Sequence, residues 1–217
     1  MIVLEHVSKT YHDSVHALKD VSLHIKKGEC CFVVGPSGAG KTTLFKLLYA
    51  MERPTAGSVY LHDRDICTLN ERDVQAMRRG MGFVFQDFKL INDWTVYDNT
   101  AIMLQILYKP SIYIRSRVWK MLKWVGLQHK VYEKAGNLSG GERQRLALVR
   151  SIIHDPDIII ADEPLESLDE EIAGYIMDVF CRLKKKGTTI VFAGHKQDTP
   201  LDYSRLIFMD KGVILND

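Results

Sequence analysis

Four short stretches of the chain consist almost entirely of apolar residues, and each ends at a polar residue or a glycine-rich turn. They lie at residues 31–34, 82–85, 158–161 and 190–193. Continuous apolarity over so few residues is typical of strands covered on both faces, and helical-looking segments lie between the stretches, so the pattern predicts a parallel sheet. Ligands of such sheets bind beyond the carboxyl ends of the strands. The residues that follow the four stretches are therefore expected to gather at one edge.

Strands of a second kind are predicted near the two ends of the chain. At residues 21–25 and 58–61 apolar and polar residues alternate or nearly so, which favours an antiparallel sheet with one face in solvent. Residues 206–209 and 213–215 are apolar and flank Asp210-Lys211-Gly212, a pattern that predicts a hairpin.

The middle of the chain, from Gln86 to Ser139, has the apolar spacing of helices. Residues 101–108 and 118–125 predict two helices, separated by a break at 109–111 that contains a proline.

Composition narrows the class of protein. The 217 residues, 24.8 kDa, 46% apolar and 26% charged, suit one globular domain of generous size. The formal net charge of +2 does not indicate a dedicated nucleic-acid binder. No apolar run approaches the roughly 18 to 20 residues that span a bilayer, and no signal-peptide pattern opens the chain. The four cysteines lack C-x-x-C spacing, so we expect reduced thiols without a disulfide or a zinc site.

A phosphate-binding loop is predicted directly after the first apolar stretch. Residues 35–42 read Gly-Pro-Ser-Gly-Ala-Gly-Lys-Thr and fit G-x-x-x-x-G-K-[ST] between a predicted strand and a predicted helix. In such loops backbone N–H groups and a helix amino terminus surround the phosphates, the lysine bridges the β- and γ-phosphates, and the threonine holds Mg²⁺. The expected nucleotide-binding residues are Gly35, Pro36, Ser37, Gly38, Ala39, Gly40, Lys41, Thr42 and Thr43.

A pair of carboxylates, Asp162 and Glu163, follows the third apolar stretch at the same expected edge. Asp162 would orient Mg²⁺, and Glu163 would polarise the water that attacks the γ-phosphate. Pro164 disfavours the α conformation at Glu163 and so helps to fix the direction of that carboxylate. The alternative is a solvated acidic turn, but the phosphate loop in the same chain favours the catalytic interpretation.

The string LSGGE at 138–142 opens another predicted helix. Ser139 with Glu142 three residues later is the pattern of a capping box, which is a purely structural explanation. However, two glycines in a first turn cost about 1 kcal/mol each, and a capping box does not need them. Because glycines let a phosphate approach the helix end closely, we interpret Ser139, Gly140 and Gly141 as a second phosphate-binding site.

The order of these motifs resembles that of an ABC-type ATPase. Besides the phosphate loop and LSGGE, the resemblance rests on Gln86, Asp162-Glu163-Pro164, Ser167-Leu168-Asp169 and His195, and it covers essentially the whole chain. It implies an α/β fold of the P-loop NTPase type, with a mainly parallel core sheet, an amino-terminal antiparallel β subdomain and an inserted α-helical subdomain.

The resemblance also implies a division of the single domain 1–217. Residues 1–86 and 156–217 would form the ATP-binding core with the β subdomain, and residues 87–155 the helical subdomain that carries the LSGGE string.

Further roles follow from the resemblance alone. In the family two subunits enclose two ATP molecules head to tail, so that LSGGE of one subunit faces the phosphate loop of the other. Gln86 resembles the ligand of Mg²⁺ and of the attacking water, and His195 the switch histidine at the γ-phosphate. Asp169 resembles the D-loop residue at the dimer seam, and Tyr11 the aromatic that stacks on adenine. Structural explanations exist for His195 as a core histidine and for Tyr11 as a half-buried sheet aromatic.

Within the family the chain is most similar to the ATPases of bacterial cell division. The likeness rests on residues 52–55, 85–88 and 95–99, and it implies a cytoplasmic subunit on the inner face of the cell membrane that drives a transmembrane partner. Three departures from the family pattern are Gly194, where a threonine is common, residues 165–167, where Thr-Gly-Asn is more usual, and Trp94, where the residue is often polar or basic. The second leaves the local D-loop geometry open.

Apolar residues after Gln86 suggest where such a partner docks, because they fit neither a helical stripe nor strict alternation. The alternative is that they fill the core of the helical lobe. The expected docking residues are Phe88, Leu90, Ile91, Trp94 and Tyr97.

Three other functions stay open at this point. The same ATPase could serve a lipoprotein-release or macrolide-type exporter. A small-molecule kinase would need an acceptor site and a lid instead of LSGGE. In a scaffold that does not hydrolyse ATP, the nucleotide would only hold a dimer together, and Glu163 and His195 argue against that.

Overall fold

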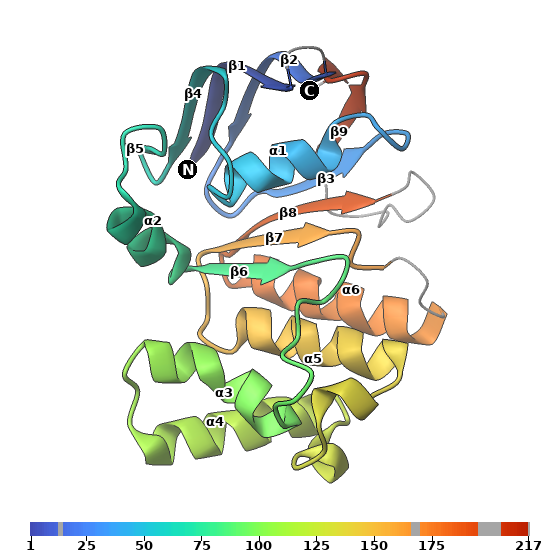
Figure 1. Ribbon diagram of the computed structural model, residues 1–217. Helices are drawn as coiled ribbons and strands as arrows, with labels where there is room; N and C mark the ends of the chain where they lie inside the picture. The colour runs from blue at the N-terminus through green and yellow to red at the C-terminus, as the bar shows by residue number, and fades with distance from the viewer. Residues whose placement is uncertain (13–14, 166–169, 195–204, 217) are drawn as a thin grey trace.

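The chain forms stacked layers of sheets and helices (Figure 1). The structure is a computed structural model, and it describes residues 1–12, 15–165, 170–194 and 205–216. A four-stranded sheet lies at the top of Figure 1, a six-stranded sheet lies in the middle, and helices cover the lower face of the second sheet.

The six-stranded sheet has the order β10-β9-β3-β8-β7-β6. The pairs from β9 to β6 run parallel, and β10 pairs antiparallel with β9. All four apolar stretches form strands of this sheet, and the carboxyl-terminal hairpin is present, so both predictions are confirmed. The strands are β3 (Cys30–Val34), β6 (Met81–Val84), β7 (Ile158–Asp162), β8 (Thr189–Gly194), β9 (Arg205–Asp210) and β10 (Val213–Asn216).

Burial on both faces explains the continuous apolarity of these strands. In β3, Phe32 and Val34 belong to the core that the sheet shares with the helices below it. Val33, between them, belongs to a second core, which the sheet shares with the antiparallel sheet above it. Successive side chains of a strand point to opposite faces, so each residue of β3 needs an apolar side chain.

The antiparallel sheet has the order β2-β1-β4-β5. Its strands are longer than the sequence pattern indicated, and β2 begins at Val15 although the alternation at residues 21–25 is interrupted at Lys19-Asp20. Every pair in it runs antiparallel, as predicted. The strands are β1 (Ile2–Tyr11), β2 (Val15–Ile25), β4 (Ala56–Leu61) and β5 (Arg64–Asp65).

Helix α1 lies between the two sheets, and α5 and α6 cover the lower face of the parallel sheet, with α3 and α4 outside them (Figure 1). The two predicted helices of the middle segment are α3 and α4. The α-helices are α1 (Lys41–Leu48), α2 (Glu71–Arg78), α3 (Val96–Ile106), α4 (Ser111–Trp124), α5 (Gly140–Ile152) and α6 (Glu170–Lys185), and two 3₁₀ turns span Gln128–Lys130 and Ala135–Asn137.

Both helices of the middle segment begin earlier than predicted. Helix α3 begins at Val96, because the Thr95 hydroxyl accepts a hydrogen bond from the N–H of Asp98 and caps the helix. Helix α4 begins directly after Pro110, at the predicted break. The division of the chain at residues 87–155 stays a prediction. Among the described helices, none is long and apolar enough to cross a membrane.

Candidate functional site

The predicted phosphate loop connects the carboxyl end of β3 to the start of α1. Two of its glycines are required by the backbone. A Cβ atom on Gly35 would overlap the carbonyl oxygen of Met209 on β9. Gly40 has a φ of +105°, and a Cβ atom there would lie 2.6 Å from the carbonyl oxygen of Ala17 on β2. The loop is therefore packed tightly against both sheets, which fixes its path.

Lys41, the lysine of the loop motif, is buried, with 6% of its surface exposed. Its ammonium group donates hydrogen bonds to the carbonyl oxygens of Gly35 at 2.7 Å and Pro36 at 3.3 Å. It also lies 3.7 Å from a carboxylate oxygen of Glu163. The positive charge of Lys41 is thus held at the point where the loop meets the end of β7.

Glu163 lies between Lys41 and Gln86. One carboxylate oxygen faces Lys41, and the other accepts a hydrogen bond of 3.3 Å from the amide of Gln86. The structure therefore brings together three residues that are far apart in the sequence and that were all predicted to be in the site.

The backbone of Glu163 adopts a strained conformation. Its φ is +48°, so the residue leaves the right-handed α region, as Pro164 predicts, but enters the left-handed region instead of the extended one. Its N–H donates to the carbonyl oxygen of Ala193 at 3.1 Å, which holds it against β8. A non-glycine residue in this region costs about 1 to 3 kcal/mol, and such strain is concentrated at functional sites.

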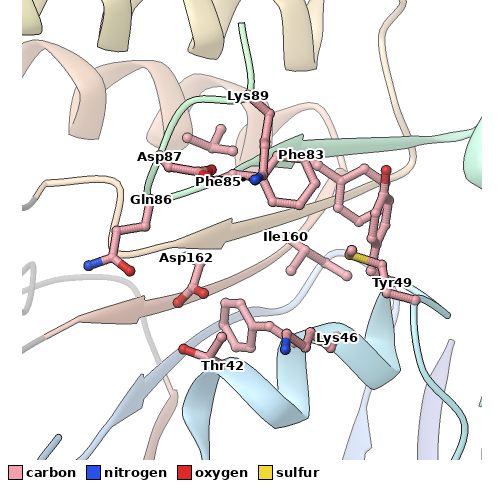
Figure 2. Close-up of a pocket in the computed structure, with 13 residues that line it drawn as sticks. Thr42, Lys46, Tyr49, Phe83, Phe85, Gln86, Asp87, Lys89, Ile160 and Asp162 are labelled. Carbon is pink, nitrogen blue, oxygen red and sulfur yellow. Dashed lines mark ion pairs between the residues drawn. The ribbon is translucent and has the colours of Figure 1, made fainter.

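Next to this group is a cavity of about 370 Å³. The three predicted Mg²⁺ ligands, Thr42, Gln86 and Asp162, line it together, and Figure 2 shows their polar ends close to one another at one end of the cavity. A hydroxyl, an amide oxygen and a carboxylate are the hard oxygen donors that Mg²⁺ prefers, and Mg²⁺ typically takes its remaining ligands from water and phosphate. The donor set therefore fits Mg²⁺. The other end of the cavity is aromatic, with Tyr49 beside Phe83.

Ser139 caps helix α5. Its hydroxyl accepts a hydrogen bond from the N–H of Glu142, and the Glu142 carboxylate accepts one of 2.9 Å from the N–H of Ser139, so the capping box exists. Gly140 is exposed, and a Cβ atom added to it would meet no atom within 4 Å. The packing of this subunit therefore does not explain Gly140.

The amino-terminal end of α5 lies on the same side of the molecule as the carboxyl ends of β3 and β7, on the right in Figure 1. Ser139, Gly140 and Gly141 are not among the residues that line the cavity beside Thr42. Within the described part of the chain, the two predicted phosphate sites thus face the same way but do not form one pocket.

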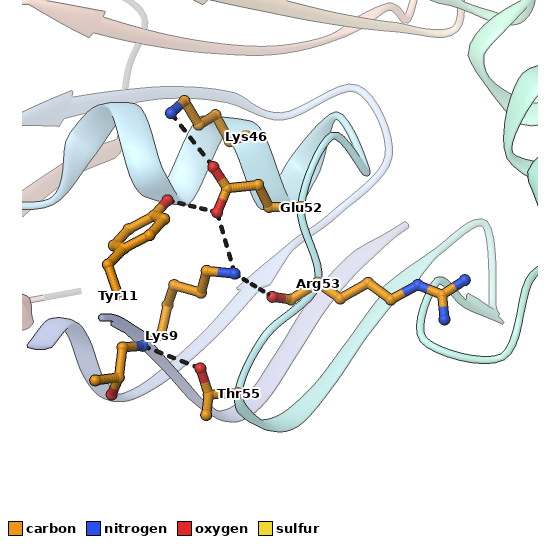
Figure 3. Close-up of polar contacts among 7 residues, drawn as sticks. Lys9, Tyr11, Lys46, Glu52, Arg53 and Thr55 are labelled. Carbon is orange, nitrogen blue, oxygen red and sulfur yellow. Dashed lines mark hydrogen bonds and ion pairs between the residues drawn. The ribbon is translucent and has the colours of Figure 1, made fainter. Parts of the chain in front are cut away.

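Tyr11, the predicted adenine contact, belongs to a network of polar side chains around Glu52 (Figure 3). The Tyr11 hydroxyl donates to the Glu52 carboxylate at 2.5 Å. The Lys9 ammonium lies 3.1 Å from the same carboxylate and 5.0 Å from the centre of the Tyr11 ring. Lys46, on α1, lies 3.3 Å from Glu52. Glu52 therefore connects the end of β1 to the helix that carries the phosphate loop.

This network shifts the pKa values of two of its members. Burial and the hydrogen bond to Glu52 raise the pKa of the Tyr11 hydroxyl. For Glu52, burial by itself would raise the pKa, but the hydrogen bonds from Tyr11, Lys9 and Lys46 outweigh burial and lower it. At neutral pH the network thus holds a carboxylate and a neutral phenol.

The docking prediction requires the apolar side chains after β6 to be exposed, and only some of them are. Leu90 is only 9% exposed and is part of the helical core, so the prediction is wrong for Leu90. Phe88 and Tyr97 are half-buried against the same core. Ile91 and Trp94 are exposed, at 40% and 39%.

Two polar side chains, the buried Asn99 and the half-buried Arg150, hold this segment in place and explain why Leu90 turns inward. The buried amide of Asn99 accepts a hydrogen bond from the N–H of Ile91 at 2.9 Å and donates one to its carbonyl oxygen at 3.0 Å. Arg150, on α5, donates to the carbonyl oxygens of Phe88 and Lys89 at 2.6 and 2.7 Å. Phe88 and Lys89 both have positive φ, 62° and 48°, so the chain turns sharply just after Gln86.

Gln144 is a site residue that the sequence reasoning missed. It is buried on α5 and donates a hydrogen bond of 2.5 Å to the carbonyl oxygen of Pro164, next to Glu163. Its spacing from Ala147 and Leu148 puts a polar side chain on the buried face of the helix. A polar residue on an apolar helix face could have identified Gln144 from the sequence, because a buried amide needs a hydrogen-bond partner.

Asp169 and His195 lie outside the described residues, so their predicted roles stay predictions.

Comparison with known proteins identifies the class. A family model described as ABC transporter matches residues 18–166, and the chain therefore belongs to the ABC transporter family, as an ATPase that binds ATP and uses Mg²⁺. Its α/β fold, with a mainly parallel core sheet, is the fold of ABC ATPase cassettes.

Among its relatives, the cell division ATP-binding protein FtsE of Bacillus subtilis is 39% identical, over 100% of this chain and 96% of that protein. The methionine import ATP-binding protein MetN 1 of Bacillus thuringiensis is 36% identical, over 100% of this chain and 66% of that protein. A solved dimer of a bacterial ABC transporter cassette superposes with a TM-score of 0.94 at 33% identity, covering 100% of this chain and 97% of that one. A post-hydrolysis dimer of the same cassette holds ADP and Pi.

Proposed function

We propose that this protein is the ATP-hydrolysing subunit of a bacterial cell-division complex, which dimerises around two ATP molecules and drives a transmembrane partner of the FtsX type. The observation that carries the proposal is the position of Glu163, with one carboxylate oxygen 3.7 Å from the ammonium of Lys41 and the other 3.3 Å from the amide of Gln86. The cell-division role is supported by the identity to FtsE over nearly the full length of both chains.

In this proposal the phosphate loop, from Gly35 to Thr43, binds the phosphates of ATP. A phosphate oxygen forms a stronger, charge-assisted hydrogen bond to the Lys41 ammonium than the two loop carbonyls do. Thr42, Gln86 and Asp162 would hold Mg²⁺, which when bound neutralises charge on the phosphates.

Glu163 would take up the proton of the attacking water. Gln86, hydrogen-bonded to one oxygen of the carboxylate, orients the side chain, and the strained backbone leaves it little freedom to turn away. His195 and Asp169 keep the roles that the family resemblance implies, at the γ-phosphate and at the dimer seam.

The dimer in this proposal is of the head-to-tail kind. The amino-terminal end of α5 faces outward on the side of the phosphate loop, and the open space beside Gly140 leaves room for a phosphate or a second subunit. Ser139, Gly140 and Gly141 of one subunit would then complete the nucleotide site of the other. The solved dimers of a similar cassette support this arrangement.

The transmembrane partner would dock in a groove of about 470 Å³ between α2, β6 and α3. The groove is lined by apolar side chains, among them Ile91, Ile102 and Ile106, and by basic side chains such as Arg78, Arg79 and Arg150. A short helix of a partner is the typical occupant of such a groove. Docking there would place the subunit at the inner face of the cell membrane, cytoplasmic and peripheral.

Glu163→Gln tests the proposed chemistry. The variant keeps the shape of the side chain but loses the basic oxygen, so we expect ATP hydrolysis to fall by at least about a hundredfold, with ATP binding retained. Sedimentation should then show that the dimer accumulates with ATP. Glu71→Gln, at an exposed carboxylate on α2, is the matched control and should hydrolyse ATP normally.

Three results would contradict the proposal or a part of it. Hydrolysis by Glu163→Gln at the normal rate would remove the catalytic role of Glu163. Transfer of the γ-phosphate to a metabolite, detected in a coupled assay, would make the protein a kinase. Copurification with an exporter permease in place of an FtsX-type protein would leave the ATPase intact and change its partner.

A further inference from the structure

The helical part of the chain contains a long stretch that has basic residues but no acidic ones. Residues 99–132 contain no aspartate or glutamate and six lysines and arginines, although the whole chain has 27 acidic residues among 217. At that frequency, about one in eight, a stretch of this length would hold about four carboxylates. The stretch spans most of α3 and the whole of α4.

Large apolar side chains are exposed in the same stretch. Tyr108 and Ile112, at the turn between α3 and α4, are 92% and 88% exposed, and Tyr113 is 44% exposed. Ile106 and Trp119, on either side of the turn, are 41% and 36% exposed. Single exposed apolar residues are ordinary, but a cluster within fourteen positions indicates a contact surface.

Helix α4 divides cleanly into an inner and an outer face. Ile114 and Val118 are buried in the helical core. Ile112, Arg115 and Trp119 follow one another at helical spacing and are all exposed. We call this surface the α4 outer face; it comprises Tyr108, Lys109, Ile112, Tyr113, Arg115, Trp119, Lys120 and Lys123.

The cations of the α4 outer face form no ion pairs with carboxylates in the described part of the chain. Elsewhere in the stretch, Arg117 pairs with Asp155 at 2.8 Å and Lys130 with Glu142 at 2.9 Å. By contrast, Lys109, Arg115, Lys120 and Lys123 are exposed, and among the described residues no ion pair with a carboxylate is found for them. Their charge is therefore directed to the surroundings of the protein.

The α4 outer face adjoins the groove proposed for the transmembrane partner. Ile102 and Ile106 on α3 line that groove, and Tyr108 follows two residues later. In Figure 1 the turn between α3 and α4 lies on the same side of the molecule as α2, the opposite wall of the groove. A partner that reaches the groove from the membrane would bring this turn near the lipid headgroups.

We propose that the α4 outer face binds the anionic surface of the membrane. Tyrosine, tryptophan and isoleucine next to unpaired lysine and arginine are the side chains that bind at the boundary between headgroups and acyl chains. A bilayer accepts projecting side chains without a preformed pocket, and the uniform positive charge of the face is complementary to its negative lipids. The inference rests on the proposed function for the orientation of the subunit, but the lipid contact itself needs no nucleotide.

Vesicle sedimentation of the full-length protein tests the inference. Vesicles are made either of phosphatidylcholine alone or of equal parts phosphatidylcholine and phosphatidylglycerol. We expect the protein to pellet with the anionic vesicles only, and to be released as salt is raised toward about 0.5 M, because screening weakens the attraction.

Two double variants remove the two components of the surface. Tyr108→Ser with Ile112→Ser removes apolar area, and both side chains are almost fully exposed, so folding should be unaffected. Arg115→Glu with Lys123→Glu reverses charge and should lower vesicle affinity by at least about 25-fold, at about fivefold for each cation lost. The matched control is Val15→Ser with Lys19→Glu, on the exposed part of β2, at the opposite end of the molecule in Figure 1.

Loss of binding in both variants, with the control unchanged, supports a membrane-binding surface. The inference is overturned if the normal protein ignores anionic vesicles, or if the variants bind as well as the control. It is also overturned if Tyr108→Ser with Ile112→Ser abolishes self-association of the protein while vesicle binding is absent, since the face is then a protein interface. ATP hydrolysis is measured on every variant, so a protein without ATPase activity that still binds vesicles would refute the proposed function and leave this inference standing.

Discussion

The carboxylate of Glu52 joins the predicted adenine contact to the phosphate-loop helix, and Glu52→Gln isolates its charge. Gln keeps the size of the side chain and still accepts a hydrogen bond from Tyr11. It loses the two ammonium partners, Lys9 at 3.1 Å and Lys46 at 3.3 Å. We therefore expect a loss of stability without any change in packing.

The size of this loss follows from the exposure of the groups. The Glu52 and Lys9 side chains are 22% and 16% exposed, but Lys46 is 42% exposed, so solvent screens the second pair more. Screened pairs contribute about 0.2 to 1 kcal/mol each, and the charge assistance of the Tyr11 hydrogen bond adds a similar amount. A total of about 1 to 2 kcal/mol corresponds to a fall in melting temperature of about 2 to 8 °C for a chain of this size.

The dependence of this loss on pH gives a second, sharper test. The pKa of Glu52 is lower in the folded protein than its usual value of 4.5, because the three hydrogen bonds outweigh the effect of burial. A carboxyl group with a lowered pKa stabilises the fold above its unfolded pKa, and this contribution is lost as pH falls through the folded pKa. The difference in unfolding free energy between the normal protein and Glu52→Gln should be complete at neutral pH and shrink in acid, below about pH 4.

Urea denaturation at neutral pH and below about pH 4 measures the difference in unfolding free energy. Glu5→Gln, at an exposed carboxylate, is the control. Tyr11→Phe keeps the aromatic ring and loses the hydroxyl, so the double variant Tyr11→Phe with Glu52→Gln should lose less than the sum of the two single losses. A variant Glu52→Gln as stable as the normal protein, or a difference that is the same in acid, would refute the reasoning.

Measurements of nucleotide binding show whether Glu52 orients the Tyr11 ring or only stabilises the fold. If Glu52 orients the ring for adenine, Glu52→Gln should weaken ATP binding by about fivefold, a part of the 1 to 3 kcal/mol of base stacking. Binding of inorganic triphosphate, which has no base, should be unchanged. Equal losses for both ligands in calorimetry would mean that Glu52 only stabilises the fold.

Three further outcomes are expected. Lys41→Ala should weaken ATP binding by about 30-fold or more in calorimetry, because truncating one partner of a buried charge pair costs about 2 to 5 kcal/mol; an affinity within a factor of two of normal contradicts this. Ser139→Arg should abolish the ATP-dependent dimer in sedimentation, whereas Ser139→Ala should cost only about 1 kcal/mol through loss of the helix cap. Ile91→Glu should fold normally but lose the membrane partner in pull-down experiments, since Ile91 lines the proposed groove and is 40% exposed, whereas Val96→Glu, at 0% exposure, should unfold the protein.

The parts of the fold that could be predicted from sequence are those that a local pattern determines. The parallel sheet was predictable because both faces of each strand are covered, so every position needs an apolar residue. The start of α3 was missed because the cap, Thr95 with Asp98, is polar and lies outside the apolar pattern. The position of Leu90 was missed for a different reason. Whether an apolar side chain in a loop turns inward depends here on Asn99, which folds back on the backbone of Ile91, and no spacing rule encodes that contact.

The candidate site likewise has one part that a local motif predicts and other parts that only the fold brings together. The phosphate loop is a continuous motif, so its position between β3 and α1 was predictable from nine residues. The contact of Gln86 with Glu163 joins residues 77 positions apart, and only the rule that parallel strands end at one edge suggested it. The bond from Tyr11 joins the end of β1 to Glu52, in the connection between α1 and β4, and no pattern in the sequence pairs the two residues.

Helix α5 connects the three regions on which the proposed function depends. At its amino-terminal end, Ser139 caps the helix on the side of the phosphate loop. One turn further, Gln144 holds the carbonyl oxygen of Pro164, beside Glu163. Near its end, Arg150 holds the carbonyl oxygens of Phe88 and Lys89, between Gln86 and the groove. A helix of 13 residues is a stiff rod of about 20 Å, so these contacts cannot move independently. The buried amide of Gln144 and the half-buried guanidinium of Arg150 would lose hydrogen bonds if the helix shifted along one neighbour alone. In the proposed function, a single element therefore holds the proposed catalytic carboxylate, the proposed dimer face and the proposed partner groove in one fixed geometry.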